Sequence, residues 1–327
     1  MSFERIVGHA EAVAALRKRL GAKTLPHALL FTGPSGVGKR TLAHETVKAL
    51  LCEKKTDDAC DRCGPCGKAE RLVHPDLRLV APGENGQIGI AEIRELGARM
   101  RLKPLESSVQ AAILGGAETM GDDAQNAFLK LLEEPPPGVH FILVVSDVAR
   151  LFPTVISRCQ KISFGPLKPE EVLEVLRRLP GFEKADAARL AGRSQGSVET
   201  ALALKDLDVS RIEDGVFGYL RQARTSEIAP FPDRGKTKRE EALLEIDTLA
   251  GALRDLYLMK TVPGVSGDKL FFKDRRSELE KILPRISPDE LERSIEAAGR
   301  SREAVEQSGN PRLVFADLWI NCGVRFF

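Results

Sequence analysis

The sequence predicts an α/β fold, with a parallel sheet in the first half of the chain and helices in the second half. Short continuous apolar runs alternate with helical patterns up to about residue 165, and no further strand pattern follows. Such runs are typical of strands buried on both faces, and their alternation with helices favours a parallel sheet. The strands are predicted at 28–31, 77–80, 111–114 and 141–145, and the helices between them at 9–20, 39–51, 90–102 and 122–133.

The remaining helices fall into two groups. A small three-helix unit is predicted from the apolar face of 169–179 and two shorter segments, 184–192 and 197–205. From about residue 208 the pattern stays helical, with a polar loop at 225–238. Asn310-Pro311 combines an N-cap residue with proline at the first helical position, and this pair predicts the start of a final helix.

Composition limits the class of protein. The chain has 327 residues, of which 43% are hydrophobic and 29% charged, and this predicts two or three globular domains. The net charge of +2 excludes a strongly basic, histone-like binder. The longest apolar run, 141–145, is far shorter than a membrane span, and the N-terminus does not have the pattern of a secretory signal. We therefore expect no membrane segment and a cytoplasmic location.

A phosphate-binding loop is predicted after the first strand. The segment Gly33-Pro34-Ser35-Gly36-Val37-Gly38-Lys39 stands between that strand and the next helix. The glycines Gly33, Gly36 and Gly38 allow backbone N–H groups to turn toward a phosphate, and Lys39 adds a full positive charge. The alternative is a glycine-rich turn that only resembles this motif.

The groups that would hold magnesium beside this loop are missing. Arg40 follows the lysine where serine or threonine is needed, and Thr41 lies one residue too late, about 100° around the helix. Gly115 and Gly116 end a later strand where a carboxylate is needed, and Glu118 is out of register. We therefore expect no phosphoryl transfer at this loop, while its binding of ATP or ADP stays open.

A cysteine cluster predicts a structural zinc site. Two short C-x2-C steps and one longer step can place four thiolates at the corners of a tetrahedron. Asp57, Asp58 and Asp61 should make this loop polar and solvent-facing, while Cys159 and Cys322 are expected to be packing residues. A redox or iron–sulfur role is the alternative. The four predicted ligands are Cys52, Cys60, Cys63 and Cys66.

Arg158 is the candidate catalytic residue. It lies in Ser157-Arg158-Cys159, at the end of the predicted sheet region. An arginine there could act in trans on the ATP site of a neighbouring subunit, and such arginine fingers accelerate phosphoryl transfer by about 10³–10⁵. The alternative is a surface arginine held in a salt bridge.

Together these segments resemble the bacterial replicative clamp-loader family of AAA+ proteins over nearly the whole chain. Ser157-Arg158-Cys159 matches the family's SRC motif, and Ser146 fits a sensor position. The segment 196–199, which ends at Glu199, resembles the family's lid, but it has no arginine where an active subunit would contact its own γ-phosphate. Further matches are the opening at 27–33, the helix 126–136, Arg254-Asp255-Leu256 and the helix at Asn310-Pro311.

The resemblance implies an architecture and a set of partners. It implies an AAA+ domain at 1–165 with a zinc module at 52–66, a lid at 166–207 and an oligomerisation collar at 208–327. The chain would join a motor subunit and a δ-type subunit in a five-membered ring of the DNA polymerase III holoenzyme. That ring would load the sliding clamp onto primer–template DNA, with Arg158 completing a neighbour's ATP site.

Two alternatives to this function remain open from the sequence. One is an active ATPase motor subunit, which would need the magnesium ligands that the sequence lacks. The other is a metalloprotein whose zinc loop recruits a partner and whose AAA+ fold serves only as a scaffold.

Overall fold

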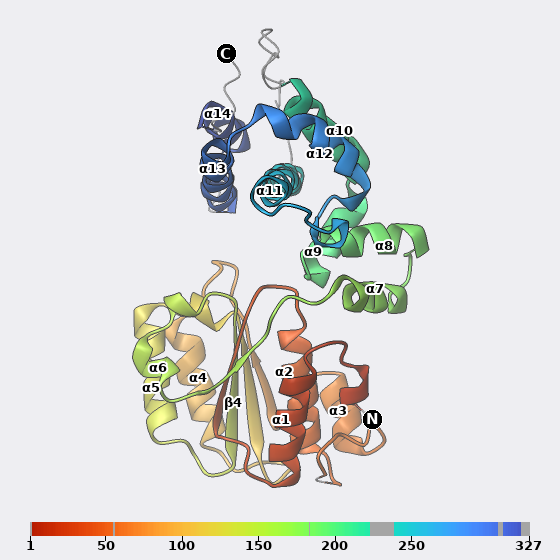
Figure 1. Ribbon diagram of the computed structural model, residues 1–327. Coiled ribbons are helices and arrows are strands. Elements are labelled where there is room, and N and C mark those ends of the chain that lie inside the picture. Colours follow the sequence, from red (N-terminus) through yellow and green to blue (C-terminus); the bar gives the residue numbers. More distant parts are fainter. Residues whose placement is uncertain (1, 55, 183, 223–238, 307–309, 322–327) are drawn as a thin grey trace. The chain divides into compact units, whose positions relative to one another are not determined.

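The computed structural model describes residues 2–54, 56–182, 184–222, 239–306 and 310–321 (Figure 1). The chain divides into two compact units, Met1–Ala201 and Leu202–Phe327. The polar loop expected at 225–238 and Cys322 lie outside the described residues.

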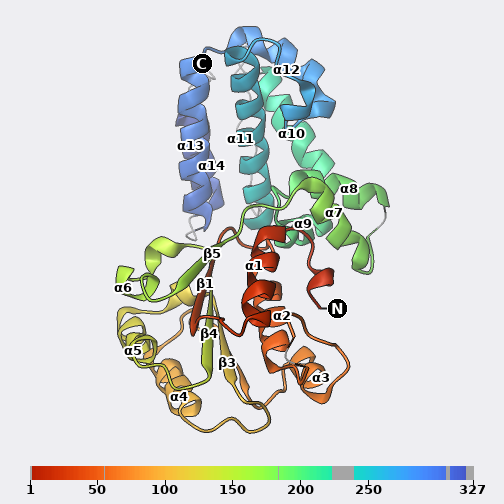
Figure 2. The ribbon, with the colours of Figure 1, turned by 60° about the horizontal axis from the view of Figure 1, so that its bottom comes forward.

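The first unit contains a parallel sheet of five strands in the order β2-β3-β4-β1-β5 (Figure 2). All four predicted strands are present. The fifth strand, β5, was not predicted, because it lies at the edge of the sheet and is mostly exposed. The strands are β1 (Ala28–Thr32), β2 (Leu77–Val80), β3 (Gln110–Gly115), β4 (Val139–Val145) and β5 (Gln160–Ser163).

Helices cover both faces of this sheet. Along β1, Leu29 and Phe31 face one hydrophobic core, while Ala28 and Leu30 face the other. This alternation of buried side chains explains why the strands are apolar at every position. The first face is covered by α1 (Ala10–Gly21), α2 (Lys39–Leu51) and α3 (Gly64–Glu70), and the second by α4 (Ile90–Met100) and α5 (Asp122–Glu133) (Figures 1 and 2).

Shorter helices connect and follow the sheet. The three-helix unit predicted after the sheet is present as α7 (Pro169–Arg178), α8 (Lys184–Arg193) and α9 (Val198–Ala203), which we call the lid segment. The short α6 (Pro153–Ile156) precedes β5, and 3-10 turns occur at Phe3–Arg5, Ala117–Thr119, Val148–Arg150 and Leu204–Asp206.

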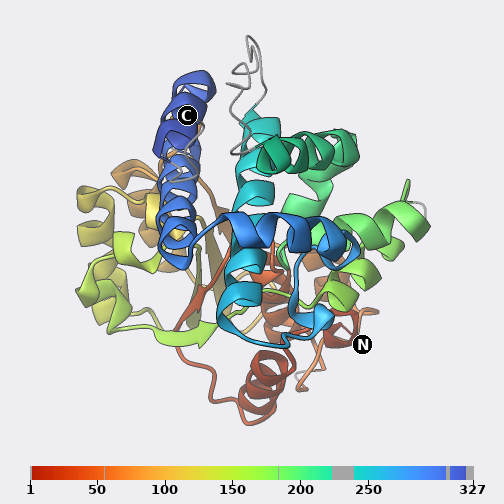
Figure 3. The same ribbon diagram turned by 45° about the horizontal axis from the view of Figure 1, so that its top comes forward.

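The second unit is helical throughout its described residues. The apolar stripe of α11 (Arg239–Thr261), which includes Leu249, Leu253 and Leu256, is buried in the core of this unit. Asp255 is also buried, and its carboxylate accepts the backbone N–H groups of Phe271 and Phe272. The helices of the second unit are α10 (Val209–Gln222), α11 (Arg239–Thr261), α12 (Arg276–Ile282), α13 (Pro288–Glu306) and α14 (Pro311–Asn321), with 3-10 turns at Gly267–Lys269, Lys273–Arg275 and Leu283–Arg285 (Figure 3). Among the described helices of the chain, none combines the length and apolarity that crossing a bilayer requires.

Candidate functional site

The phosphate loop has the strand–loop–helix context that the sequence predicts. It leaves the carboxyl end of β1 and ends where Lys39 begins α2. Gly33 has φ of 147°, and a Cβ there would lie 2.2 Å from the carbonyl oxygen of Phe164. Gly36 and Gly38 also have positive φ, of 71° and 99°. Glycine is therefore needed here both for the backbone conformation and for the close approach of β5's C-terminal extension.

Lys39 is turned back onto its own loop. Its ammonium donates to the carbonyl oxygens of Gly33 and Pro34, and lies 3.2 Å from the hydroxyl of Ser146 at the end of β4. The residue is only 5% exposed, and this burial lowers the pKa of the ammonium. Since an ammonium has three N–H donors, these three contacts within the chain can use all of them.

Two carboxylates lie close to this lysine and partly offset the effect of burial on its pKa. They are Glu118 and Glu199. Glu118, which we expected to be out of register, accepts the backbone N–H of Ser146 at 3.0 Å and so joins the network around Lys39. Glu199 comes from the lid segment, at the start of α9. The positive charge of the loop is thus balanced by the chain's own acidic groups.

The start of α9 packs directly against the loop. The hydroxyl of Ser35 donates to the Glu199 carboxylate at 2.6 Å, and the N–H of Val198 donates to the carbonyl oxygen of Gly36 at 2.9 Å. A Cβ on Gly36 would lie 2.2 Å from the hydroxyl of Ser197. The lid segment therefore packs against the loop, and its anionic Glu199 side chain would repel a nucleotide phosphate bound there.

The residues at the positions where magnesium ligands are needed are Arg40, Gly115 and Gly116. Arg40 and Thr41 are both exposed on α2. Gly115 ends β3, and Gly116 follows it with φ of 68°. No carboxylate is therefore present at the end of β3, and the described residues here lack the hydroxyl–carboxylate pair that holds magnesium in phosphate-loop ATPases.

Arg158 lies just before β5, and its guanidinium makes two contacts. One terminal nitrogen lies 2.8 Å from the carboxylate of Glu133, and the other donates to the carbonyl oxygen of Thr154 at 3.0 Å. Its side chain is 37% exposed. The salt bridge that was the alternative reading of this residue does exist, but it leaves the guanidinium accessible. The neighbouring Cys159 packs against the core, and burial raises the pKa of its thiol to about 12.

Arg158 and the phosphate loop lie at opposite ends of the strands. Strands β1 and β5 are parallel and adjacent, with residues 29–32 paired to 160–163. The loop follows the carboxyl end of this paired stretch, whereas Arg158 precedes its amino end. The stretch alone spans about 10 Å. Arg158 is therefore placed away from its own loop.

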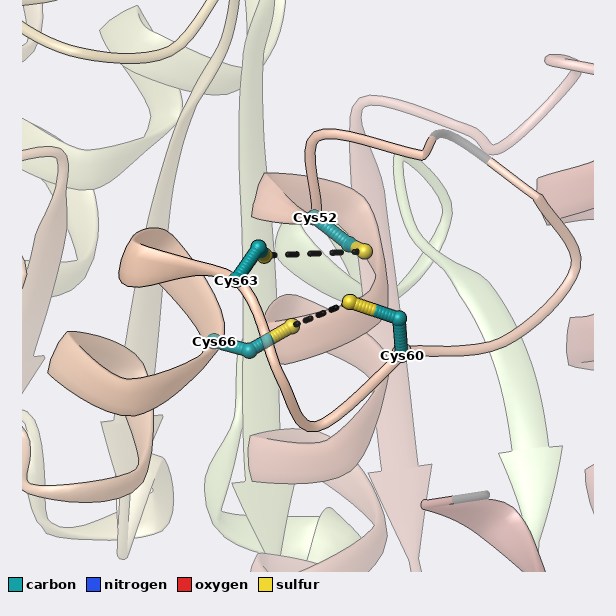
Figure 4. A group of neighbouring side chains, drawn as sticks. All are labelled: Cys52, Cys60, Cys63 and Cys66. Atoms are coloured by element: carbon teal, nitrogen blue, oxygen red, sulfur yellow. Dashed lines mark hydrogen bonds between the residues drawn. The ribbon is translucent and has the colours of Figure 1, made fainter.

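The cysteine cluster has the geometry of a metal site (Figure 4). All four sulfur atoms lie within 4.8 Å of one another, and the pairs Cys52–Cys63 and Cys60–Cys66 are each 4.0 Å apart. These four cysteines are free rather than disulfide-bonded. Tetrahedral zinc with bonds of about 2.3 Å needs sulfurs about 3.8 Å apart, so the residues fit zinc.

The electrostatics of the cluster also suit a thiolate site. The backbone N–H groups of Arg62 and Cys63 help to lower the pKa of the Cys60 thiol to about 6, with the bond from Arg62 contributing most. A thiolate is therefore available at neutral pH. Burial raises the pKa of the Cys52 and Cys66 thiols, and a bound cation would be needed to hold these as thiolates.

The expectation that all three aspartates of this loop face solvent is wrong. Asp58 is 2% exposed, and its carboxylate accepts the N–H groups of Phe3 and Ala59. Asp57 pairs with Arg17 of α1 at 2.8 Å. These contacts attach the cysteine loop to the N-terminal segment and α1, because each carboxylate has a partner there.

A buried lysine ties the cluster to α2. The ammonium of Lys48 lies 2.8 Å from Glu45 and 3.0 Å from Asp61, and it also bonds Glu70 of α3. Burial alone would lower its pKa, but these three carboxylates outweigh burial and raise it. Because this cation already fills the space between Glu45 and Glu70, these two acids serve a structural ion-pair network.

Three of these partners were not found from the sequence. Glu199 was noted only as part of a lid segment that lacks an arginine, Glu133 only as part of a helix, and Lys48 not at all. Lys48 shares a polar face of α2 with His44 and Glu45, so the sequence pattern carried no signal of its burial. The contacts of Glu133 and Glu199 join residues 25 and 164 positions apart, and local patterns do not carry that information.

Comparisons with known proteins identify the family. The family described as "DNA polymerase III, delta subunit" matches residues 8–168. The chain is 26% identical to DNA polymerase III subunit tau of Bacillus subtilis, over 96% of this chain and 60% of the relative. It is 34% identical to the delta' subunit of the same organism, over 56% of this chain and 55% of the relative. The chain thus spans less than two thirds of these two relatives.

Two further similar proteins are a curated relative and a solved structure. The delta' subunit of Haemophilus influenzae is 28% identical over 70% of each chain. A solved structure of a DNA polymerase III gamma subunit-related protein from Thermotoga maritima aligns with a TM-score of 0.45 and 18% identity, over 96% of this chain and 99% of that chain. The family match and the curated sequence relatives support membership of this chain in the clamp-loader family of AAA+ proteins.

Proposed function

We propose that this chain is a δ′-type subunit of a bacterial replicative clamp loader that hydrolyses no ATP itself. In this role Arg158 completes the ATP site of an adjacent motor subunit. The helical unit acts as the collar that joins the ring, and the cysteine cluster holds a structural zinc ion. The ring loads the sliding clamp onto primer–template DNA. Family membership supports the assembly, and the remaining points rest on the residues themselves.

The position of Arg158 carries the proposal. It lies before the amino end of β5, while its own phosphate loop follows the carboxyl end of the adjacent β1. An exposed guanidinium so placed cannot stabilise a phosphate in its own loop. It can reach a nucleotide only on another molecule, which is what an arginine finger supplied in trans requires.

The state of the loop supports the loss of hydrolysis. Lys39 is bonded to the loop's own carbonyl oxygens, and the Glu199 carboxylate accepts from Ser35. Arg40 and Gly115 stand where an active motor subunit needs magnesium ligands. These features together argue against the alternative of an active motor subunit.

Arg158→Ala tests this proposal. The loader is assembled from the chain's own partner subunits, with the phosphate-loop lysine replaced in every motor subunit except the one adjoining this chain. We expect ATP turnover, stimulated by clamp and primed DNA, to fall by about 10³-fold while assembly stays intact. Arg150→Ala, at another exposed arginine, is the matched control. Unchanged turnover in the Arg158 variant would show that this residue is not a finger.

A further inference from the structure

Glu133 is the residue that holds the guanidinium of Arg158 in place. It is the last residue of α5, and its carboxylate lies 2.8 Å from a terminal nitrogen of Arg158. Its side chain is half exposed, so it contributes little to the packing of the helix. The contact joins the end of α5 to the turn that precedes β5.

The helix itself gives no reason for an acid at this position. Asp122 and Asp123 in the first turn of α5 suit the positive end of the helix dipole. Glu133 lies at the opposite end, where the helix dipole disfavours a negative charge. The favourable partner that offsets this cost is the guanidinium of Arg158.

The two contacts of Arg158 fix its orientation and leave donors free. One terminal nitrogen is bound by Glu133 and the other by the carbonyl oxygen of Thr154. A guanidinium has five N–H groups, so three remain for an anion. The two contacts restrict the orientation of the group, so part of the rotamer entropy of this long side chain is lost before a ligand arrives.

We propose that Glu133 is a positioning residue for Arg158, aligning the free edge of its guanidinium toward the nucleotide phosphates of an adjacent subunit. The inference rests on the proposed function, because Arg158 must act in trans for its alignment to matter. Glu133 itself does not contact the nucleotide. Its effect should therefore appear in the turnover rate and depend on the presence of Arg158.

The experiment is a double-mutant cycle in the assembled loader with one competent ATP site. We expect Glu133→Ala to lower kcat about fivefold, the upper end for an exposed ion pair, with KM for ATP changed less than about twofold. Glu133→Gln should restore at least half of kcat, because its amide oxygen still accepts from the guanidinium. Glu133→Ala should have no further effect when Arg158→Ala is already present. Glu134→Ala, at the adjacent exposed carboxylate, is the matched control.

Each outcome of the cycle decides the inference. It is overturned if Arg158→Ala lowers turnover but Glu133→Ala does not. It is also overturned if the Glu133→Ala loss persists in the Arg158→Ala background, which would indicate a general structural effect. A rise in kcat would mean that Glu133 restrains the arginine rather than aligning it. If Arg158→Ala has no effect, the proposed function itself fails. Should Glu133→Ala fold poorly, Glu133→Ser repeats the cycle.

Discussion

The cationic side chains at the carboxyl and amino ends of the parallel strands lie in opposite environments. At the carboxyl edge Lys39 is 5% exposed, and its donors are taken up by Gly33, Pro34 and Ser146. At the amino edge Arg158 is 37% exposed and keeps three N–H groups free of the described partners. A cation can serve a ligand only when it is accessible and has donors to spare. Lys39 in the phosphate loop meets neither condition, whereas Arg158 meets both.

The acidic residues beside these two cations, Glu199 and Glu133, also differ in their effect. Glu199 reaches the loop from the lid segment and accepts a hydrogen bond from Ser35. Glu133 contacts one terminal nitrogen of the Arg158 guanidinium and leaves other N–H groups of the guanidinium to other partners. The first acid would repel an anionic ligand at the loop, whereas the second would orient a cation toward one.

The largest expected effect comes from changing the shape of the cationic group at Arg158. Arg158→Lys keeps the charge but loses the planar fork that grips two oxygens at once. We expect turnover at the adjoining ATP site to fall about 10²-fold, with Arg150→Lys as the control. If the lysine variant keeps more than half of wild-type turnover, charge alone is enough and the oriented guanidinium is unimportant.

A smaller effect is expected from opening the phosphate loop. Glu199→Ala removes the carboxylate that accepts from Ser35 and lies near Lys39. Loss of this charge-assisted hydrogen bond and of the repulsion toward phosphate should tighten ATP and ADP binding to the purified chain about tenfold. Calorimetric titration measures this, with Glu170→Ala as a control on the exposed face of the lid segment. Equal affinities for wild type and Glu199→Ala would contradict closure by this carboxylate.

A change at the cysteine cluster should affect stability more than a change at Arg158 or at the phosphate loop. We expect one zinc ion per chain, and Cys60→Ser with Cys63→Ser should abolish it and lower the thermal midpoint by about 5 °C or more. Metal analysis and thermal unfolding measure both. The ratio of wild-type to Arg158→Ala turnover should stay the same in variants that fold. Loss of loader assembly with unchanged stability would instead make the cysteine loop an interface.

Much of the fold could be predicted because its cores are built from local patterns. The continuous apolar runs identified four strands, and the glycine loop fixed the start of α2 at Lys39. The strand β5 was missed because Gln160, Lys161 and Ser163 are exposed at the sheet edge and carry no apolar signal. Element boundaries elsewhere agree within one or two residues for most helices of the sheet region.

The sites were predictable as residue types but not as contacts. Spacing alone was enough to propose the four cysteine ligands, because their geometry is set within 15 residues of chain. The closure of the loop by Glu199 depends on how the lid segment packs, and the Glu133–Arg158 pair depends on where α5 ends relative to β5. The burial of Asp58 depends likewise on the docking of Phe3. Such contacts arise from tertiary packing between segments far apart in the sequence.

The most direct test compares Lys39→Ala and Arg158→Ala side by side in the assembled loader, measuring ATP turnover stimulated by clamp and primed DNA. In an active phosphate loop the lysine is essential, whereas here its contacts are internal. We expect turnover within about twofold of wild type for Lys39→Ala and a loss of about 10³-fold for Arg158→Ala at the adjoining site. The reverse result, with turnover abolished by Lys39→Ala and kept by Arg158→Ala, would mean that this chain is itself a motor.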